Sequence, residues 1–271
     1  AASDAELVAD CEDAPEEVTR LDAEREQNRQ HWEQVAAQDP QSLRKAVVQA
    51  LIGDGALFNS QKQILSALDN NIDTLAVMAT GRGKSLTFQV HAATRALASG
   101  QASLFVYPLR ALIADQAYHL NHALLPFGLN AEVLTGESAP EERQRIFEGL
   151  AQGTVDIVLT TPEFLTIHAN RLAQSGRIGF LVVDEAHHIG QARAGNRMAY
   201  AHIDRAIARL GNPCVLALTA TADAQCAQAI EETLGCHHRV LDRTERKNLV
   251  LDDQRNLKQS DPYLANLVSQ G

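Results

Sequence analysis

The stretch LAVMATGRGKSLTFQ, residues 75–89, carries the strongest local indication of the fold of this chain. An apolar run is followed by Gly81, Gly83, Lys84 and Ser85, after which the pattern becomes helical. A strand, a glycine-rich turn and a helix N-terminus direct several backbone N–H groups and the positive end of the helix dipole at one point, which favours a polyphosphate. The two glycines permit positive φ and a close approach of phosphate.

The match to a general phosphate loop is incomplete. Lys84 can reach the β- and γ-phosphates, and Ser85 can place its hydroxyl on Mg²⁺. The general pattern has a glycine six residues before the lysine, and Met78 stands at that position. On this stretch alone, an ordinary tight turn between a strand and a helix stays open.

The rest of the chain alternates short apolar runs with segments of helical periodicity. The runs lie at residues 74–78, 103–107, 131–135, 156–160, 180–184 and 214–218. Because these runs are apolar on both faces and are separated by helical segments, the pattern predicts an α/β fold with a mostly parallel sheet and helices on both sides. Ligands bind such sheets at the carboxyl ends of the strands.

A second element, FLVVDEAHH at residues 180–188, places two carboxylates just past an apolar run. Asp184 and Glu185 are adjacent at a strand end, so they point in different directions. One can hold the Mg²⁺ shell while the other polarises an attacking water. An acidic strand-to-loop junction is the plainer interpretation, but both elements at strand ends in this order predict nucleotide hydrolysis.

The charge of the chain is unevenly distributed. The net charge is −10, and residues 1–40 hold 12 Asp/Glu and 3 Arg, a balance of −9 that leaves −1 for the remainder. Overall charge therefore gives no support to nucleic-acid binding. The 4 cysteines form no CxxC pair, and no apolar run reaches the roughly 18 residues of a spanning helix. These features predict a reducing, cytoplasmic or nucleoid-associated location.

Three segments are expected along the chain. Residues 1–50 form an acidic helical N-terminal arm, an exposed helix or a partly disordered segment as far as Asp39. A helix beginning after Pro40 then ends at Gly53. Residues 51–240 form the nucleotide-binding lobe, and residues 241–271 form a linker toward a second lobe.

The motifs MATGRGKS (residues 78–85) and DEAH (residues 184–187) resemble those of the superfamily 2 helicases, and the finer pattern resembles their RecQ-like branch. The match runs from about Leu57 to Asn248. This resemblance implies a RecA-like P-loop NTPase lobe that uses ATP and Mg²⁺. It also implies nucleic acid as a partner, with DNA ranked before RNA, and a helicase or translocase activity.

The resemblance assigns roles to individual residues. It implies catalytic roles for Lys84, Asp184, Glu185 and His187, a Mg²⁺ site at Ser85 and Asp184, and nucleotide binding by Phe58, Gln61, Thr80, Gly81, Gly83, Lys84 and Ser85. The amide of Gln61 carries a donor and an acceptor that can pair with N6 and N7 of adenine. A solvated helix residue is the alternative for Gln61. Phe58 replaces the family's adenine-stacking arginine.

Further motifs resemble those that contact the nucleic-acid strand or couple hydrolysis to movement. They are YPLRALIADQ (107–116), TTPEFL (160–165) and LALTATAD (216–223), and the implied residues are Arg110, Thr160, Pro162, Gln191, Arg193, Arg197, Thr219 and Thr221. As alternatives, the first two motifs are ordinary helix starts, and the two threonines of the third motif are helix caps ahead of Asp223. After DEAH the family is rich in aromatics, whereas here Tyr200 stands alone, so arginine–phosphate contacts are expected in place of base stacking.

Two hypotheses follow for function. In the first, the chain is the N-terminal motor lobe of a RecQ-like helicase, and by itself it binds ATP poorly and turns it over slowly because a second lobe, in the same or another chain, supplies an arginine finger. In the second, it is a non-catalytic lobe that binds nucleic acid or a protein partner and uses ATP as a conformational ligand. The acidic arm is a candidate site for a protein partner, and an RNA helicase lobe remains a lower-ranked alternative.

Overall fold

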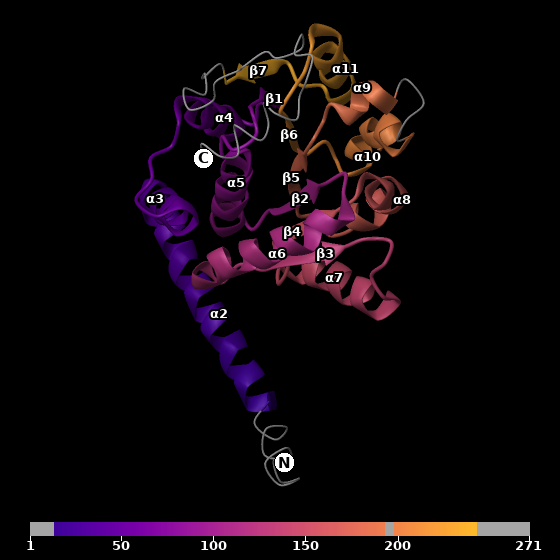
Figure 1. Ribbon diagram of the computed structural model, residues 1–271. Helices are drawn as coiled ribbons and strands as arrows, with labels where there is room; N and C mark the ends of the chain where they lie inside the picture. The colour runs from indigo at the N-terminus through magenta and orange to yellow at the C-terminus, as the bar shows by residue number, and fades with distance from the viewer. Residues whose placement is uncertain (1–13, 193–197, 243–271) are drawn as a thin grey trace, which may run out of the picture.

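The computed structural model describes residues 14–192 and 198–242. Within these ranges the strands form one seven-stranded sheet with the order β3-β4-β2-β5-β6-β1-β7 (Figure 1). The strands are β1 (Thr74–Val77), β2 (Ala102–Val106), β3 (Ala131–Leu134), β4 (Ile157–Thr160), β5 (Ile178–Val183), β6 (Cys214–Thr219) and β7 (His238–Leu241). Every neighbouring pair is parallel, which confirms the predicted α/β class.

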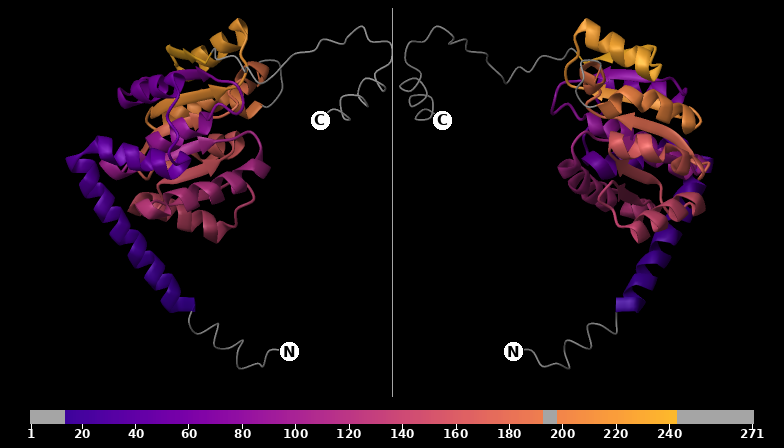
Figure 2. Two further views of the ribbon diagram at one scale, coloured as in Figure 1. Left: turned by 60° about the vertical axis from the view of Figure 1, so that its left-hand side comes forward. Right: turned by 90° about the vertical axis from the view of Figure 1, so that its right-hand side faces the viewer.

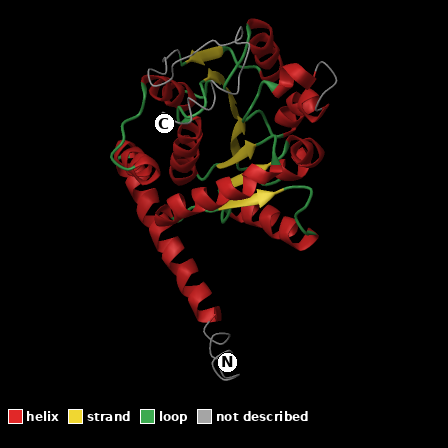
Figure 3. Cartoon of the chain, in the orientation of Figure 1, coloured by secondary structure: helices red, strands yellow, loops and turns green. Residues whose placement is uncertain are grey.

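Helices cover both faces of this sheet (Figure 3). They are α2 (Ala14–Gln38), α3 (Pro40–Ile52), α4 (Asn59–Asp69), α5 (Lys84–Ser99), α6 (Arg110–Leu124), η1 (Leu125–Phe127), α7 (Pro140–Gln152), α8 (Pro162–Ala173), α9 (His188–Ala192), η2 (Met198–His202), α10 (Ile203–Arg209) and α11 (Ala224–Leu234). α3 to α6 share one apolar core with the sheet, and α7, α8, α10 and α11 share the other.

The two cores arise because successive side chains of a strand point to opposite faces. Leu75 lies in the core under α8, α10 and α11, and its neighbour Ala76 lies in the core under α3 to α6. Leu104 and Phe105 of β2 divide in the same way. This two-sided burial is why the strands read as continuous apolar runs in the sequence.

β7 is the strand that the apolar runs did not predict. It spans 4 residues and pairs with β1 at the edge of the sheet. Val240 is buried while His238 and Arg239 are more exposed, so the segment has no continuous apolar run. A short edge strand needs little apolar surface, which explains the missing signal.

The predicted boundaries of α3 are confirmed. The Asp39 carboxylate accepts hydrogen bonds from the backbone N–H groups of Gln41 and Ser42, both at 3.1 Å, and Pro40 opens the helix. The helix ends at Gly53, whose φ is 63°. Asp39 therefore acts as an N-cap, and the proline lies at the position where its missing N–H is not needed.

The second half of α2 packs against the lobe, so the expected exposed arm is exposed only in part. A Cβ on Gly128 would lie 2.6 Å from the backbone nitrogen of Arg29, and the indole Nε1 of Trp32 donates to Pro126 O at 3.0 Å. The Trp32 ring also contacts Phe127, with centroids 4.9 Å apart. The N-terminal end of α2 extends away from the sheet (Figure 2).

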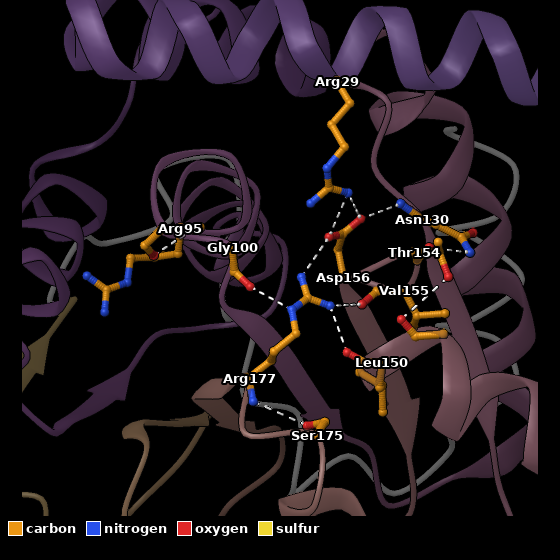
Figure 4. Close-up of polar contacts among 12 residues, drawn as sticks. Arg29, Arg95, Gly100, Asn130, Leu150, Thr154, Val155, Asp156, Ser175 and Arg177 are labelled. Carbon is orange, nitrogen blue, oxygen red and sulfur yellow. Dashed lines mark hydrogen bonds and ion pairs between the residues drawn. The ribbon is translucent and has the colours of Figure 1, made fainter. Parts of the chain in front are cut away.

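A buried ion-pair network joins α2 to the sheet (Figure 4). The Asp156 carboxylate is 0 % exposed and accepts from Arg29 Nη1 at 3.0 and 3.1 Å and from the Asn130 N–H at 3.0 Å. Arg177 Nη2 lies 3.6 Å from the same carboxylate. Burial raises the pKa of Asp156, and the two guanidinium groups and the N–H oppose this rise. The acidic arm is thus attached to the lobe by one of its few arginines.

A buried histidine on α5 makes the stability of the lobe depend on pH. His91 is 1 % exposed, and its ring contacts Phe180 edge-on with centroids 4.6 Å apart. Burial lowers the pKa of His91, opposed by Asp69, whose Oδ1 lies 3.6 Å from Nδ1. Nearby Arg44 and Arg95 lower the pKa further.

Replacing His91 by glutamine is expected to flatten this pH dependence. In the wild-type chain the unfolded state takes up a proton as the pH falls through about 6.5, whereas the folded state resists it, so stability falls there by at most about 1.4 kcal/mol per pH unit. Urea denaturation between pH 7.5 and 5.5 measures this effect. Equal slopes for wild type and His91→Gln would remove His91 as the cause.

The topology brings three strand ends together on one edge. β6 lies between β1 and β5, with Val77 opposite Thr219 and Val183 opposite Ala217. The loop after β1 and the loop after β5 therefore flank the end of β6. Among residues 14–192 and 198–242, no helix combines the length and the apolar character needed to cross a membrane.

Candidate nucleotide and nucleic-acid site

The glycine-rich turn after β1 has the backbone that a phosphate loop requires. Gly81 and Gly83 have φ of 73° and 67°, and α5 begins at Lys84 directly after them. A Cβ on Gly83 would lie 2.6 Å from Gln61 Nε2, so a larger residue would collide there. The first N–H groups of α5 have no partner within the helix and are available to an anion, and Ser85 lies in this first turn.

The carboxylate pair after β5 lies beside this loop. Lys84 Nζ is 3.6 Å from Glu185 Oε1, and the Asp184 carboxylate accepts from the Glu185 N–H at 2.9 Å. Glu185 has a φ of 48°, a left-handed conformation that is uncommon for a residue other than glycine and that is frequent at functional sites. The structure therefore brings together the lysine and the acidic pair that two distant stretches of sequence predicted.

Burial shapes the electrostatics of Asp184. It raises the pKa of the Asp184 carboxyl, and the negative charge of Glu185 acts in the same direction. Lys84 and the backbone N–H of Glu185 oppose the rise. The Asp184 carboxylate and the Ser85 hydroxyl offer the oxygen donors that Mg²⁺ prefers, so the chemistry of these side chains fits this cation.

His187 joins this pair to the end of β6. Its Nδ1 lies 3.2 Å from Glu185 Oε2 and 3.3 Å from Thr219 Oγ1. The Thr219 hydroxyl donates to Thr221 O at 2.8 Å, so its oxygen can only accept from the imidazole. This assigns the proton to Nδ1 of His187. The LALTATAD motif thus contacts the DEAH loop through Thr219, and the role of this contact in coupling stays a prediction.

Tyr107 is a residue at this edge for which the sequence motifs predict no individual role. It follows β2, next to β5, and is 4 % exposed. Burial and the charge of Asp184 raise the pKa of the Tyr107 phenol, which therefore stays protonated. Its position at the end of an apolar run, like that of Asp184, was the available signal.

Gln61 holds the phosphate loop in this conformation. Its Oε1 accepts from the Phe58 N–H at 2.8 Å, and its Nε2 donates to Arg82 O at 3.2 Å and Gly83 O at 3.0 Å. The side chain is buried, so the alternative of a solvated helix residue is wrong. Both amide hydrogens are engaged, so pairing with adenine requires Gln61 to release one loop carbonyl. That pairing stays a prediction.

A cavity of about 530 Å³ lies beside Gln61, between the start of α4 and the end of β7. Its volume falls within the roughly 300–1,000 Å³ typical of small-molecule sites. Seven residues line it: Phe58, Asn59, Ser60, Gln63, Arg82, Leu241 and Asp242. The position next to the phosphate loop suits the base of a bound nucleotide.

Of the residues predicted to contact nucleic acid, some are exposed and others are buried. Arg110 opens α6 and is exposed, but it is paired with Glu137 of the loop after β3. Thr160 is fully buried and its hydroxyl donates to Leu134 O at 2.6 Å, so it cannot touch a nucleic acid in this conformation. Pro162 is likewise buried at the first position of α8. These two predicted contacts are corrected: both residues serve the fold.

Three other predicted contacts cannot be placed in the site. Arg193 and Arg197 lie outside the described residues. Gln191 falls within the short helix α9, and only its backbone is described. Thr80, by contrast, was predicted to bind the nucleotide; it lies in the phosphate loop and is exposed.

A phosphate loop and a carboxylate pair at the carboxyl edge of one parallel sheet define a P-loop NTPase lobe of the RecA-like type. Comparison with known families agrees with this class. The model of the DEAD/DEAH box helicase family matches residues 58–229, and the chain belongs to this family.

Curated relatives support the RecQ-like resemblance. The chain is 29 % identical over 207 residues to the ATP-dependent DNA helicase RecQ of Haemophilus influenzae, covering 75 % of this chain and 32 % of that protein. It is 30 % identical over 202 residues to the human ATP-dependent DNA helicase Q4, covering 73 % and 16 %. The chain thus spans about a third or less of the relatives it matches.

Solved structures confirm the fold. The DUF1998 helicase MrfA bound to DNA has a TM-score of 0.60 at 22 % identity, over 73 % of this chain and 29 % of that one. The Hef helicase domain of Pyrococcus furiosus has a TM-score of 0.52 at 28 % identity, over 67 % and 37 %.

Proposed function

We propose that this chain is the first motor lobe of an ATP-dependent, RecQ-like DNA helicase or translocase. The observation that carries the proposal is the 3.6 Å approach of Lys84 Nζ to Glu185 Oε1, with Asp184 next to it. The lysine lies in the first turn of α5, after the loop that follows β1, and the acids directly follow β5; β6 separates these two strands. A purely structural ion pair would not also need a glycine-built phosphate cradle beside it.

The residues present suit Mg-ATP. Gly81, Gly83 and the start of α5 would hold the phosphates, Lys84 would neutralise their charge, and Ser85 and Asp184 would hold Mg²⁺. When bound, the cation would stabilise the charge that develops on the phosphates.

The remaining catalytic roles fall to Glu185 and His187. Glu185 would accept a proton from the attacking water, and the Nδ1–H of His187 would orient its carboxylate. Thr219 shares that N–H, so a movement of Glu185 would be felt at the end of β6. These contacts would link the nucleotide site to the end of β6.

DNA is the proposed nucleic acid because the RecQ-like relatives are named DNA helicases and the neighbour MrfA was solved with DNA. A second RecA-like lobe, in the same or another chain, would complete the motor. Arg110 and the exposed start of α6 would contact the phosphate backbone once Glu137 is displaced.

Replacing Lys84 by alanine is expected to weaken Mg-ATP binding by roughly 10- to 150-fold, because a charge-assisted contact contributes about 1.5–3 kcal/mol. Equilibrium dialysis with labelled ATP measures the affinity. Lys45→Ala, on the exposed side of α3, is the matched control and should bind like wild type. Equal affinity of Lys84→Ala and wild type would refute the proposal.

A further inference from the structure

Arg82, the residue between the two glycines of the phosphate loop, lies on the proposed base pocket. Its guanidinium carbon is 4.1 Å from the centroid of the Phe58 ring, and both side chains line the 530 Å³ cavity. Phe58 is 45 % exposed and caps the start of α4, so its ring is the aromatic platform of this cavity.

The stack leaves no space for a base between Arg82 and Phe58. Carbon atoms in contact lie about 3.5–4.0 Å apart, so an inserted ring would need roughly twice the observed separation. A base that stacks on Phe58 from the cavity therefore has to displace the guanidinium. Nucleotide binding and the Arg82–Phe58 contact exclude each other at this face.

A second contact keeps Arg82 in this position. Its Nε donates to Asp242 Oδ2 at 2.9 Å, and the Asp242 side chain is only 4 % exposed. Asp242 directly follows β7, and its N–H donates to Val77 O of β1 at 2.9 Å. The phosphate loop and the end of β7 are thereby joined by one ion pair across the cavity.

We propose that Arg82 is a gate on the base pocket, held closed by Phe58 and Asp242 and opened when a purine base takes its place on Phe58. The proposal rests on the proposed nucleotide function of this lobe. Arg82 belongs to the phosphate loop, and its partner Asp242 directly follows β7. Opening of the gate therefore breaks the ion pair between them, so that binding of a base changes the contacts at the end of β7.

The test compares a ligand with a base and a ligand without one. Dissociation constants of Mg-ATP and of magnesium tripolyphosphate are measured by equilibrium competition for the wild-type chain and for Asp242→Asn. Removing the negative charge of Asp242 should strengthen the binding of both anionic ligands. Only ATP carries a base that has to displace Arg82, so only its affinity should also depend on the gate. Asp242→Asn is expected to raise the preference for ATP over tripolyphosphate about three- to tenfold, the range of an ion pair of about 0.7–1.4 kcal/mol.

Further variants separate the gate from other causes. In a Phe58→Leu background, Asp242→Asn should leave the ratio unchanged, because the platform is gone. Arg82→Ala with Asp242→Asn should reach at least the ratio of Asp242→Asn alone. Asp204→Asn, an exposed acid at the start of α10, is the charge-matched control, and thermal melts of all variants report folding.

The outcomes are distinguishable. ATP binding with an unchanged ratio in Asp242→Asn would overturn the gate alone and leave the proposed function standing. A lower ratio in the Arg82→Ala double variant would show that Arg82 stacks on the base, which also overturns the gate. Failure of the wild-type chain to bind either ligand would overturn the proposed function and the gate together.

Discussion

Replacing Glu185 by glutamine is expected to lower ATP hydrolysis by about 10²- to 10⁴-fold while leaving the affinity for Mg-ATP within about twofold of wild type. Glutamine has the shape of glutamate but cannot accept the proton of an attacking water. It also keeps an amide oxygen to which His187 Nδ1, now 3.2 Å from the carboxylate, can donate. The chemical step is therefore lost with little change in the loop that holds the nucleotide.

The measurement is hydrolysis of labelled ATP with the chain in excess, with and without single-stranded DNA, beside ATP binding by equilibrium dialysis. Glu24→Gln, an exposed acid on α2, serves as the control and should behave like wild type. This experiment also separates the two hypotheses for function. ATP binding without hydrolysis in the wild-type chain, and no change in the biological function of the full-length protein carrying Glu185→Gln, would favour a lobe that uses ATP only as a conformational ligand.

Replacing Asp156 by asparagine is expected to destabilise the lobe by about 3–5 kcal/mol, the usual effect of removing one partner from a buried ion pair. The variant keeps the size of the side chain, so no cavity contributes. It leaves the guanidinium groups of Arg29 and Arg177, with side chains 13 % and 16 % exposed, without their shared counter-charge. The unfolding free energy in urea measures this loss.

The control for this prediction is Arg145→Met, which breaks an exposed ion pair with Glu132 and should change stability by about 1 kcal/mol or less. Arg29→Met should lie between the two, because Asp156 retains Arg177 and the Asn130 N–H. A double-mutant cycle of Arg29→Met and Asp156→Asn isolates their coupling. A loss in Asp156→Asn no larger than in Arg145→Met would contradict the proposed attachment of α2.

The edge of the sheet that carries the proposed nucleotide site was predictable because each of its motifs is recognisable from a few neighbouring residues. Gly81 and Gly83 indicate a turn with positive φ, and Asp184 stands at the end of an apolar run, so each motif can be recognised from a few residues. Parallel strands then place their carboxyl ends on one edge. That Lys84 meets Glu185 follows from these two local signals and the rule of the fold.

The contacts of Arg82 and Asp156 were not predictable in this way. Arg82 occupies a position that the phosphate-loop pattern leaves unspecified, and its partner Asp242 lies 160 residues away, after a strand with no apolar run. Asp156 and Arg29 are 127 residues apart, and the acidic composition of residues 1–40 suggested an arm in solvent. Thr160 failed for the opposite reason, because its motif indicated a surface contact that burial rules out.

Apolar periodicity, glycine conformation and helix capping act over a few residues, so the parallel sheet, the phosphate loop, the acidic pair and the end of α3 could be predicted from the sequence. The docking of α2 on Asp156, the contacts of Gln61 with the phosphate loop and the packing of Arg82 on Phe58 emerge only in the folded chain. These are pairings of single polar side chains across long sequence separations, and their free energy comes from burial and charge compensation that exist only once the chain has folded.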